Sequence, residues 1–301
     1  MKLTILGCYS ATPRISAHTT SQVLESRGHT FLIDCGEGTQ MELRKHKVKF
    51  NQIKHIFISH LHGDHCFGLI GLISTFRLLN REAELHIYGP KGIKDLIMLQ
   101  LKLSKSWIDF KLVFHELISL DSELIFEDDK IAIHTIPLDH RVYTNGFLFK
   151  EKAFDRKLLI DKAEEKHIDV AYYRKLKQGA DVLNTKGELI SNADVTIEGV
   201  PSKSYAFCSD TAYREDIVPI INNADVLYHE STFLEAHASL CAKTKHSTAK
   251  QAAEIAKKAN VGTLILGHYS SRYNTLDDFK TEAQTVFDRV ELAEDGKIFQ
   301  I

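Results

Sequence analysis

Residues 60–65 read His60-Leu61-His62-Gly63-Asp64-His65, which places four potential metal ligands within six residues. Imidazole and carboxylate groups are ordinary ligands of zinc and related divalent metals. The segment follows an apolar run of strand character, 56–59, and precedes a helical pattern that begins at Gly68. A polar loop that is merely rich in histidine is the alternative. We expect a metal site, with Gly63 supplying a permissive backbone where the side chains converge.

The composition is that of an ordinary globular protein. The chain has 301 residues, of which 44% are hydrophobic and 26% charged, and its formal net charge is −2. That charge neither indicates nor excludes nucleic-acid binding, because a local basic patch matters more than the total. Five scattered cysteines without a CxxC pair favour reduced thiols, and neither a signal peptide nor a membrane-spanning run is evident. We therefore expect a cytoplasmic protein with no membrane segment.

Hydrophobic periodicity predicts two successive blocks, each with strands followed by helices. In the first block we expect strands near 2–6, 21–26, 30–34, 54–59, 85–88, 111–117, 123–127 and 130–137, with helices near 68–79 and 91–103. In the second we expect strands near 204–208, 225–229 and 262–267, with helices near 214–222, 248–259 and 275–287. Two such blocks predict an α/β fold, a four-layered αββα sandwich in one domain spanning residues 1–301.

Residues 151–190 interrupt this alternation, because lysines and arginines are frequent there and apolar residues sparse. A solvated helix face and a partner-binding arm both fit such a segment. A second basic run spans 44–49. Either run could contact phosphates, since Lys and Arg supply the nonspecific part of nucleic-acid affinity.

Histidine and aspartate residues at the ends of other predicted strands complete the site. His140 follows the strand near 130–137, Asp210 follows 204–208, and His268 follows 262–267. A single polar residue at a strand end is often a cap or turn residue, but three of them indicate a shared rim. We assign the ligands to one pocket of His60, His62 and His140, a second of Asp64, His65 and His268, and a bridge, Asp210.

A metal centre of this kind predicts hydrolysis. Coordination lowers the pKa of a bound water toward about 7, which makes hydroxide available at neutral pH. Asp64 could orient that water or accept its proton. The ligands alone leave open whether the substrate is a phosphodiester, an acyl compound or a thioester.

The six-residue segment resembles the hallmark of metallo-β-lactamase-fold hydrolases, and five other segments resemble ribonuclease Z, a family that removes 3′ trailers from precursor tRNA. These segments are 34–40, 209–211, 229–232, 246–248 and 267–273. The resemblance implies a zinc-dependent endoribonuclease that leaves a tRNA 3′-hydroxyl, with two Zn²⁺ per subunit, although Mn²⁺ suits the same ligands. It also implies catalytic roles for Asp64 and for His246 as proton donor to the leaving oxygen, supported by Glu230.

The resemblance further implies that 151–190 is a substrate-binding arm, with Arg174, Lys175 and Lys177 among its tRNA contacts, and that the protein is a homodimer. Two segments depart from the family pattern. The proline loop, 13–18, keeps its proline and one basic residue, and the arm lacks a Gly-Pro-rich tip at 167–175. Apart from its role in the motif around His246, Ser247 is expected to cap the helix that follows.

Two alternatives remain open on the sequence. The same fold could act on a small substrate, as a cyclic-nucleotide phosphodiesterase or a thioesterase does. A tRNA-binding protein with a vestigial site is the second.

Overall fold

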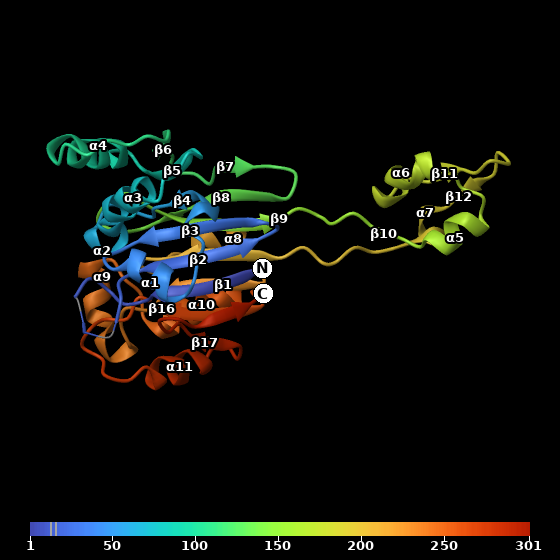
Figure 1. Cartoon of the computed structure of the whole chain (residues 1–301). Coiled ribbons are helices and arrows are strands. Elements are labelled where there is room, and N and C mark those ends of the chain that lie inside the picture. Colours follow the sequence, from blue (N-terminus) through green and yellow to red (C-terminus); the bar gives the residue numbers. More distant parts are fainter. Residues whose placement is uncertain (13, 16) are drawn as a thin grey trace. The chain divides into compact units, whose positions relative to one another are not determined.

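The computed structural model of the chain describes residues 1–12, 14–15 and 17–301. It divides into two compact units. Unit 1 comprises Met1–Lys150 and Lys203–Ile301, and unit 2 comprises Glu151–Ser202 (Figure 1). In the described part of the chain, no helix combines the length and apolar character needed to cross a membrane.

The first sheet of unit 1 has seven strands in the order β18-β1-β2-β3-β4-β5-β6. Its strands are β1 (Lys2–Gly7), β2 (Ser21–Ser26), β3 (His29–Cys35), β4 (Ile53–Phe57), β5 (Leu85–Pro90), β6 (Leu112–Leu117) and β18 (Ile298–Gln300). From β3 to β6 the strands are parallel, so each connection is a crossover that carries helical segments. These segments are α1 (Thr39–Lys45), η1 (Phe50–Gln52), α2 (Gly63–Cys66), α3 (Gly68–Leu78) and α4 (Ile93–Leu103).

The second sheet also has seven strands, in the order β17-β16-β15-β14-β9-β8-β7. They are β7 (Leu124–Glu127), β8 (Ile131–Leu138), β9 (Thr144–Glu151), β14 (Ser204–Cys208), β15 (Val226–Glu230), β16 (Thr263–Gly267) and β17 (Val290–Leu292). The helical segments between its strands are η3 (Glu215–Ile217), α8 (Val218–Ile221), η4 (Glu235–Leu240), α9 (Cys241–Thr244), α10 (Ala249–Lys258) and α11 (Asp277–Gln284).

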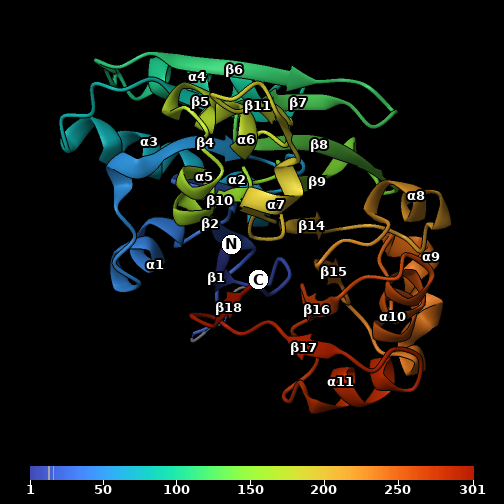
Figure 2. The ribbon, with the colours of Figure 1, turned by 90° about the vertical axis from the view of Figure 1, so that its right-hand side faces the viewer.

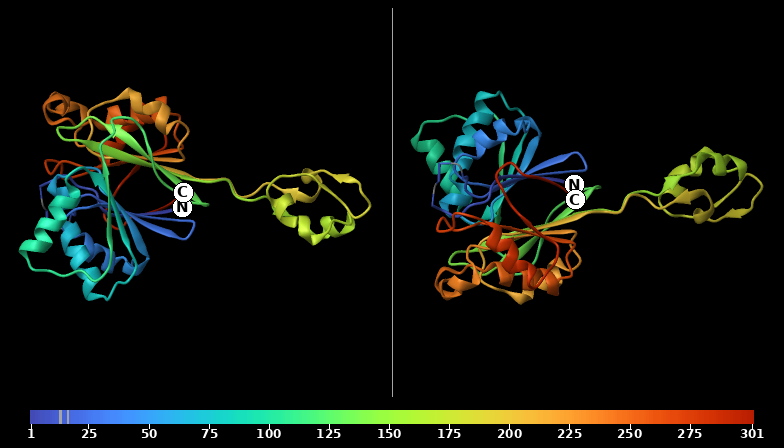
Figure 3. Two further views of the ribbon diagram at one scale, coloured as in Figure 1. Left: turned by 90° about the horizontal axis from the view of Figure 1, so that it is seen from above. Right: turned by 90° about the horizontal axis from the view of Figure 1, so that it is seen from below.

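The two sheets pack face to face through buried aromatic side chains. Phe31 of the first sheet lies 5.4 Å from Phe149 of the second, measured between ring centroids, and Phe57 lies 5.3 Å from Phe147. A separate core packs α1, α3 and α4 against the outer face of the first sheet. Helices α10 and α11 cover the outer face of the second sheet (Figure 3). The predicted four-layered α/β sandwich is therefore confirmed.

Three strands of unit 1 were not predicted, namely β9, β17 and β18. Strand β9 has Gly146 near its centre, a poor strand former by itself. A Cβ at this position would lie 2.2 Å from the carbonyl oxygen of Phe207, so the neighbouring strand β14 requires glycine there. The helix predicted at 214–222 is two short pieces, η3 and α8.

Unit 2 is built from two short antiparallel strand pairs and small helices. Strand β10 (Lys157–Leu158) pairs with β13 (Thr196–Ile197), and β11 (Val182–Leu183) pairs with β12 (Leu189–Ile190). Its helices are α5 (Ile160–Glu165), η2 (Val170–Tyr172), α6 (Tyr173–Lys177) and α7 (Asn192–Val195). The predicted segment 151–190 lies within this unit, which extends further because β13 returns to pair with β10.

Charge is distributed unevenly over unit 2. Residues 151–202 contain nine lysines and arginines against ten aspartates and glutamates, so the unit as a whole is not basic. The positive side chains gather on α6, where Arg174, Lys175 and Lys177 are exposed around the buried Leu176. Any electrostatic attraction of unit 2 for phosphates therefore rests on this helix rather than on the arm's total charge.

Candidate metal centre

The six-residue segment connects β4 to the helices that follow. His60 and His65 are fully buried, Asp64 is nearly so, and His62 is half-buried at the start of α2. Gly63 is not among the glycines with positive φ, so its backbone conformation does not require glycine. Its Cα faces the Phe67 ring, and a Cβ would lie 2.5 Å from that ring.

The other three predicted ligands arrive from the second sheet. His140 follows β8, Asp210 follows β14, and His268 follows β16. Strands β14, β15 and β16 are parallel, so their carboxyl ends open onto one edge of the sheet. The structure brings together all seven residues predicted as ligands, in groups whose ligand atoms lie within 4.8 Å of one another.

One pocket of this cluster is formed by three histidine nitrogens. His62 Nδ1 lies 2.9 Å from His60 Nε2 and 3.3 Å from His140 Nε2. In the second pocket, the Asp64 carboxylate lies 3.3 Å from His65 Nε2 and 3.5 Å from His268 Nε2. These separations are close to the roughly 3.3 Å between ligand atoms of a tetrahedral zinc site with bonds of about 2.0–2.1 Å.

Asp210 stands between the two pockets and presents one carboxylate oxygen to each. Its Oδ2 lies 3.6 Å from His60 Nε2 and 3.7 Å from His140 Nε2. Its Oδ1 lies 3.2 Å from His65 Nε2 and 3.1 Å from His268 Nε2. Asp210 thus lies where it could contribute to both pockets, and its role as a bridge stays a prediction.

The donor set fits divalent metal ions. Among the described buried groups, His65 Nε2 and His268 Nε2 have no hydrogen-bond partner. A buried polar atom without a partner is costly, and a metal ion would satisfy both nitrogens. The cluster is therefore a candidate metal-binding site, in agreement with the prediction of a metal-dependent hydrolase.

Hydrogen bonds on the outer side of the rings orient four of the five histidines. His65 Nδ1 donates to Asp34 (2.7 Å), and His140 Nδ1 donates to the carbonyl oxygen of Lys245 (3.0 Å). His60 Nδ1 lies 3.1 Å from Ser59 Oγ, and His268 Nδ1 lies 2.9 Å from Thr232 Oγ1. The two hydroxyls donate to Asp34 and Glu230, so they accept from these rings. In all four histidines the proton therefore lies on Nδ1, and the Nε2 lone pair is free to bind a metal.

Asp34 was not predicted as a site residue, although its segment contributed to the family resemblance. It is fully buried, and it accepts hydrogen bonds from Ser59 N (2.7 Å), Ser59 Oγ (2.8 Å) and His65 Nδ1. Its φ of 55° is unusual for a residue other than glycine, as is the φ of 59° at His268. Asp34 lies within β3, 31 positions before the histidine that it contacts, so the sequence gives no local signal of this contact.

The electrostatics of the cluster reflect its crowded charges. Burial lowers the pKa of His60 well below its ordinary value. Burial opposes ionisation of Asp210, but His268, His65 and His60 outweigh it and hold its pKa well below the usual range. The carboxylate is therefore ionised and available as a ligand at neutral pH.

His246 and Glu230 form a buried pair beside the metal cluster. His246 Nδ1 donates to Glu230 Oε1 (2.8 Å), which also accepts from Thr211 N (3.1 Å) and Ser247 N (3.0 Å). Burial alone would lower the pKa of His246, but the charge of Glu230 and this hydrogen bond raise it to about 9. The imidazolium form is thus favoured at neutral pH, as proton donation requires.

Ser247 does not cap the following helix, contrary to expectation. Its hydroxyl donates to the carbonyl oxygen of Thr211 (2.7 Å). The N-cap of α10 is Thr248, whose side chain accepts from Gln251 N while the Gln251 side chain accepts from Thr248 N. This capping box fixes the start of α10 and with it the position of the preceding His246.

A cleft of about 430 Å³ opens over the cluster, and His62, Asp64, Asp210, His246 and His268 reach it. Its wall includes Ser10, Ala11 and Thr12 from the loop that contains the proline segment. Pro13 and Ser16 of that segment lie outside the described residues. Arg174, Lys175 and Lys177 belong to unit 2 and are not part of this cleft.

Comparison with known proteins identifies relatives along the whole chain. The chain is 44% identical over 98% of its length to a protein named ribonuclease Z from Bacteroides fragilis, of which it covers 97%. The crystal structure of human tRNase Z, short form, matches 100% of the chain with a TM-score of 0.74 and 28% identity, covering 99% of that protein. The metallo-β-lactamase-fold protein YhfI from Bacillus subtilis matches 99% of the chain and 98% of its own length with a TM-score of 0.69, and its 20% identity shows the fold alone.

Residues 1–160, just over half of the chain, match the family model described as anti-Pycsar protein Apyc1, so this part also belongs to that sequence family. The similarity to the ribonuclease Z from Bacteroides fragilis covers 98% of the chain and so extends beyond residue 160, where Asp210, Glu230, His246 and His268 lie. The predicted family is confirmed: the chain belongs to the ribonuclease Z family of metallo-β-lactamase-fold enzymes.

Proposed function

We propose that this enzyme removes the 3′ trailer from precursor tRNA and leaves a 3′-hydroxyl on the tRNA. The observation that carries the proposal is the similarity to ribonuclease Z over nearly the entire length of both chains. The cleft agrees with it, because it combines a seven-ligand metal cluster with a histidine poised to donate a proton.

The residues of the cluster would hold two metal ions per subunit, which we propose to be Zn²⁺, with Mn²⁺ as a substitute. His60, His62 and His140 would bind one ion, Asp64, His65 and His268 the other, and Asp210 both. When bound, such a pair supplies an activated water as nucleophile and positive charge for the phosphate oxygens.

Asp64 and His246 divide the proton transfers between them in this proposal. The Asp64 carboxylate lies at the second pocket and lines the cleft, where it can orient the attacking water and accept its proton. As the bond between phosphorus and the 3′ oxygen breaks, His246 donates its proton to that oxygen, and the trailer keeps the phosphate. Glu230 holds Nδ1 of His246, so the donating atom is Nε2.

Substrate binding is assigned to α6 of unit 2. Arg174, Lys175 and Lys177 are exposed, and Lys175 Nζ lies 5.5 Å from the centre of the Tyr172 ring. These cations would contact tRNA phosphates, which position the substrate without reading its sequence. The homodimer and the cytoplasmic location remain predictions from the family and from the cysteine pattern.

The proposal is tested by incubating the zinc-loaded protein with a 3′-extended precursor tRNA and mapping the cut. We expect a single cut directly downstream of the mature 3′ region, with a hydroxyl on the tRNA and a phosphate on the trailer. Hydrolysis of bis-p-nitrophenyl phosphate without cleavage of the precursor would instead support the small-substrate alternative. Absence of both activities in metal-loaded protein would support the non-catalytic alternative.

A triple replacement, Arg174→Glu, Lys175→Glu and Lys177→Glu, tests the role of α6. It should abolish cleavage of precursor tRNA and spare hydrolysis of the small diester, because the small diester does not need α6. The slope of log affinity for tRNA against log salt concentration should become shallower by about one for each lost phosphate contact. A matched control replaces three exposed lysines elsewhere in unit 2, Lys162, Lys166 and Lys186, by glutamate; an equal loss in this control would contradict a specific role for α6.

A further inference from the structure

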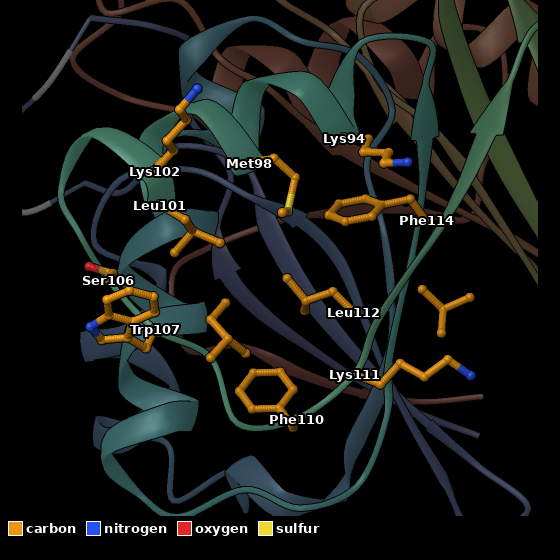
Figure 4. Close-up of a pocket in the computed structure, with 12 residues that line it drawn as sticks. Lys94, Met98, Leu101, Lys102, Ser106, Trp107, Phe110, Lys111, Leu112 and Phe114 are labelled. Atoms are coloured by element: carbon orange, nitrogen blue, oxygen red, sulfur yellow. The ribbon is translucent and has the colours of Figure 1, made fainter.

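A groove of about 620 Å³ lies in unit 1 between helix α4 and strand β6. Leu101 and Phe110 are buried at its base, while Met98 is 46% and Trp107 is 72% exposed at its sides. Figure 4 shows these side chains facing the space between the helix and the strand. Exposed apolar side chains that gather in one hollow indicate a binding surface more strongly than scattered ones do.

Lysine side chains give this groove a positive rim. Lys94, Lys102 and Lys111 line it, and none of its lining residues is acidic. Lys111 pairs with Glu84 outside the groove (2.8 Å), whereas in the described part of the chain no ion pair involves Lys94 or Lys102. An occupant that combines apolar groups with negative charge would therefore match the groove.

The groove runs along an open edge of the first sheet. Strand β6 is the outermost strand and pairs only with β5 among the described residues (Figure 2). It contains no proline and no bulge, and its single acidic residue, Glu116, instead accepts a hydrogen bond from Gly92 N (2.7 Å) at the start of α4. Neither proline nor a bulge therefore blocks pairing with another strand, and the lysines beside the edge select a partner strand that carries negative charge.

The groove and the open edge fit one kind of occupant. Leu112 and Phe114 are two residues apart, so they share the face of β6 that packs toward α4, and both line the groove. A strand added beside β6 would turn every second side chain toward the same space. We propose that this surface binds an extended segment of a partner protein that turns both apolar and acidic side chains toward the groove, and that the segment adds to the sheet as a strand beside β6.

Charge distinguishes this partner from a second copy of the chain. Pairing β6 with β6 of another copy would bring two lysine rims together, and like charges facing each other across strands are destabilising. A single strand of RNA would satisfy the lysines but would leave most of the apolar base without a complementary group. The surface lies outside the catalytic cleft, so the proposal does not depend on the proposed reaction.

Trp107 provides a direct probe, because it is the only tryptophan of the chain. We would titrate a blocked ten-residue peptide into the full chain and follow tryptophan emission. Leucine and glutamate take turns at every second position of this peptide, with serine between them, so that one face of the strand carries both. Binding should shift the emission to shorter wavelength and saturate. Lys102→Glu should weaken the peptide about tenfold or more, as the loss of about 1.4 kcal/mol would. Lys257→Glu, on the distant helix α10, serves as the matched control and should leave the affinity unchanged.

Two modified peptides keep the test independent of how well the variant folds. A peptide with lysine in place of glutamate should not bind the unmodified protein, because it would meet the lysine rim. Methylation of alternate backbone nitrogens blocks one hydrogen-bonding edge of the peptide. Of the two peptides methylated in this way, one on each edge, one should not bind, since strand pairing needs the N–H groups of the edge that faces β6.

Several results would overturn the proposal. They are a non-saturating response, equal binding of the acidic and basic peptides, and full binding by peptides methylated on either edge. Self-association in sedimentation experiments that is lost in Phe114→Lys would assign the surface to a second copy. An emission change with a twelve-nucleotide single-stranded RNA, lost in Lys102→Glu and absent with the peptide, would assign it to nucleic acid.

Discussion

Replacing Asp34 by asparagine should separate metal binding from the rest of the fold. The Asp34 carboxylate accepts three hydrogen bonds of 2.7–2.8 Å, two from Ser59 and one from His65 Nδ1, and it is fully buried. An asparagine amide has one oxygen and one NH₂ group, so it cannot accept from all three donors. If the NH₂ group faces His65, the imidazole must carry its proton on Nε2 and can no longer bind a metal there.

The expected magnitude follows from these contacts. One unsatisfied buried donor costs about 1–3 kcal/mol of folding free energy in the metal-free protein. Loss of the partner that orients a metal-binding histidine costs about 10- to 100-fold in metal affinity or activity. We therefore expect Asp34→Asn to bind zinc about 10- to 100-fold more weakly in chelator competition and to show a comparable loss of kcat/KM at limiting zinc.

A matched control distinguishes positioning from general destabilisation. Asp225 accepts hydrogen bonds from Ser204 N and Ser204 Oγ, both 2.9 Å, far along the strand from the cluster. Asp225→Asn should lower stability in urea unfolding and leave zinc affinity unchanged. Unchanged zinc affinity in Asp34→Asn, measured under conditions where the protein is folded, would show that Asp34 does not position His65 for metal binding.

Three further predictions concern protons and helix capping. Glu230→Gln should lower the pKa of His246, so the alkaline loss of kcat/KM should move to lower pH; an unmoved profile would count against His246 as proton donor. Thr248→Ala should cost about 0.5–2 kcal/mol in thermal or urea unfolding while the cut stays at the same position, because the N-cap is lost and the cluster is not. Burial and the nearby His86, His29 and His115 lower the pKa of His55 to about 4, so its share of stability is complete above about pH 6.5 and is lost as the pH falls toward 4. In urea unfolding His55→Phe should remove up to about 3 kcal/mol of that dependence, and an unchanged slope between pH 6.5 and 4 would contradict it.

The sequence determined most of the metal cluster because its signals are local or recur at strand ends. Four ligands lie in one segment, and His140, Asp210 and His268 each follow a strand that its own apolar pattern reveals. Parallel strands place their carboxyl ends on one edge, so the convergence of these residues could be inferred before any contact was known. The division into two pockets, with Asp210 between them, agrees with the observed distances.

Other features could not be read from local patterns. Strand β9 is held by its neighbours rather than by its own propensity. Gly146 lowers the strand propensity of this segment, yet glycine is required there because the backbone of Phe207 approaches closely. Ser247 and Thr248 are both acceptable caps by residue type, and only the contact of Ser247 with Thr211 leaves the capping role to Thr248. The lysines and arginines of 151–190 suggested a basic segment, but unit 2 as a whole is not basic. Acidic residues balance the basic ones everywhere except on α6.

The types and order of the residues along the chain were therefore enough to predict a metal centre, whereas the contacts that hold its ligands are visible only in the folded protein. Ligand type and spacing are written along the chain, because a metal site needs particular atoms. The orientation of His65 by Asp34, the ionised pair of His246 and Glu230, and the open edge at β6 arise only when distant segments meet. Such contacts depend on packing between sheets and helices, which the order of residues in any one segment does not record.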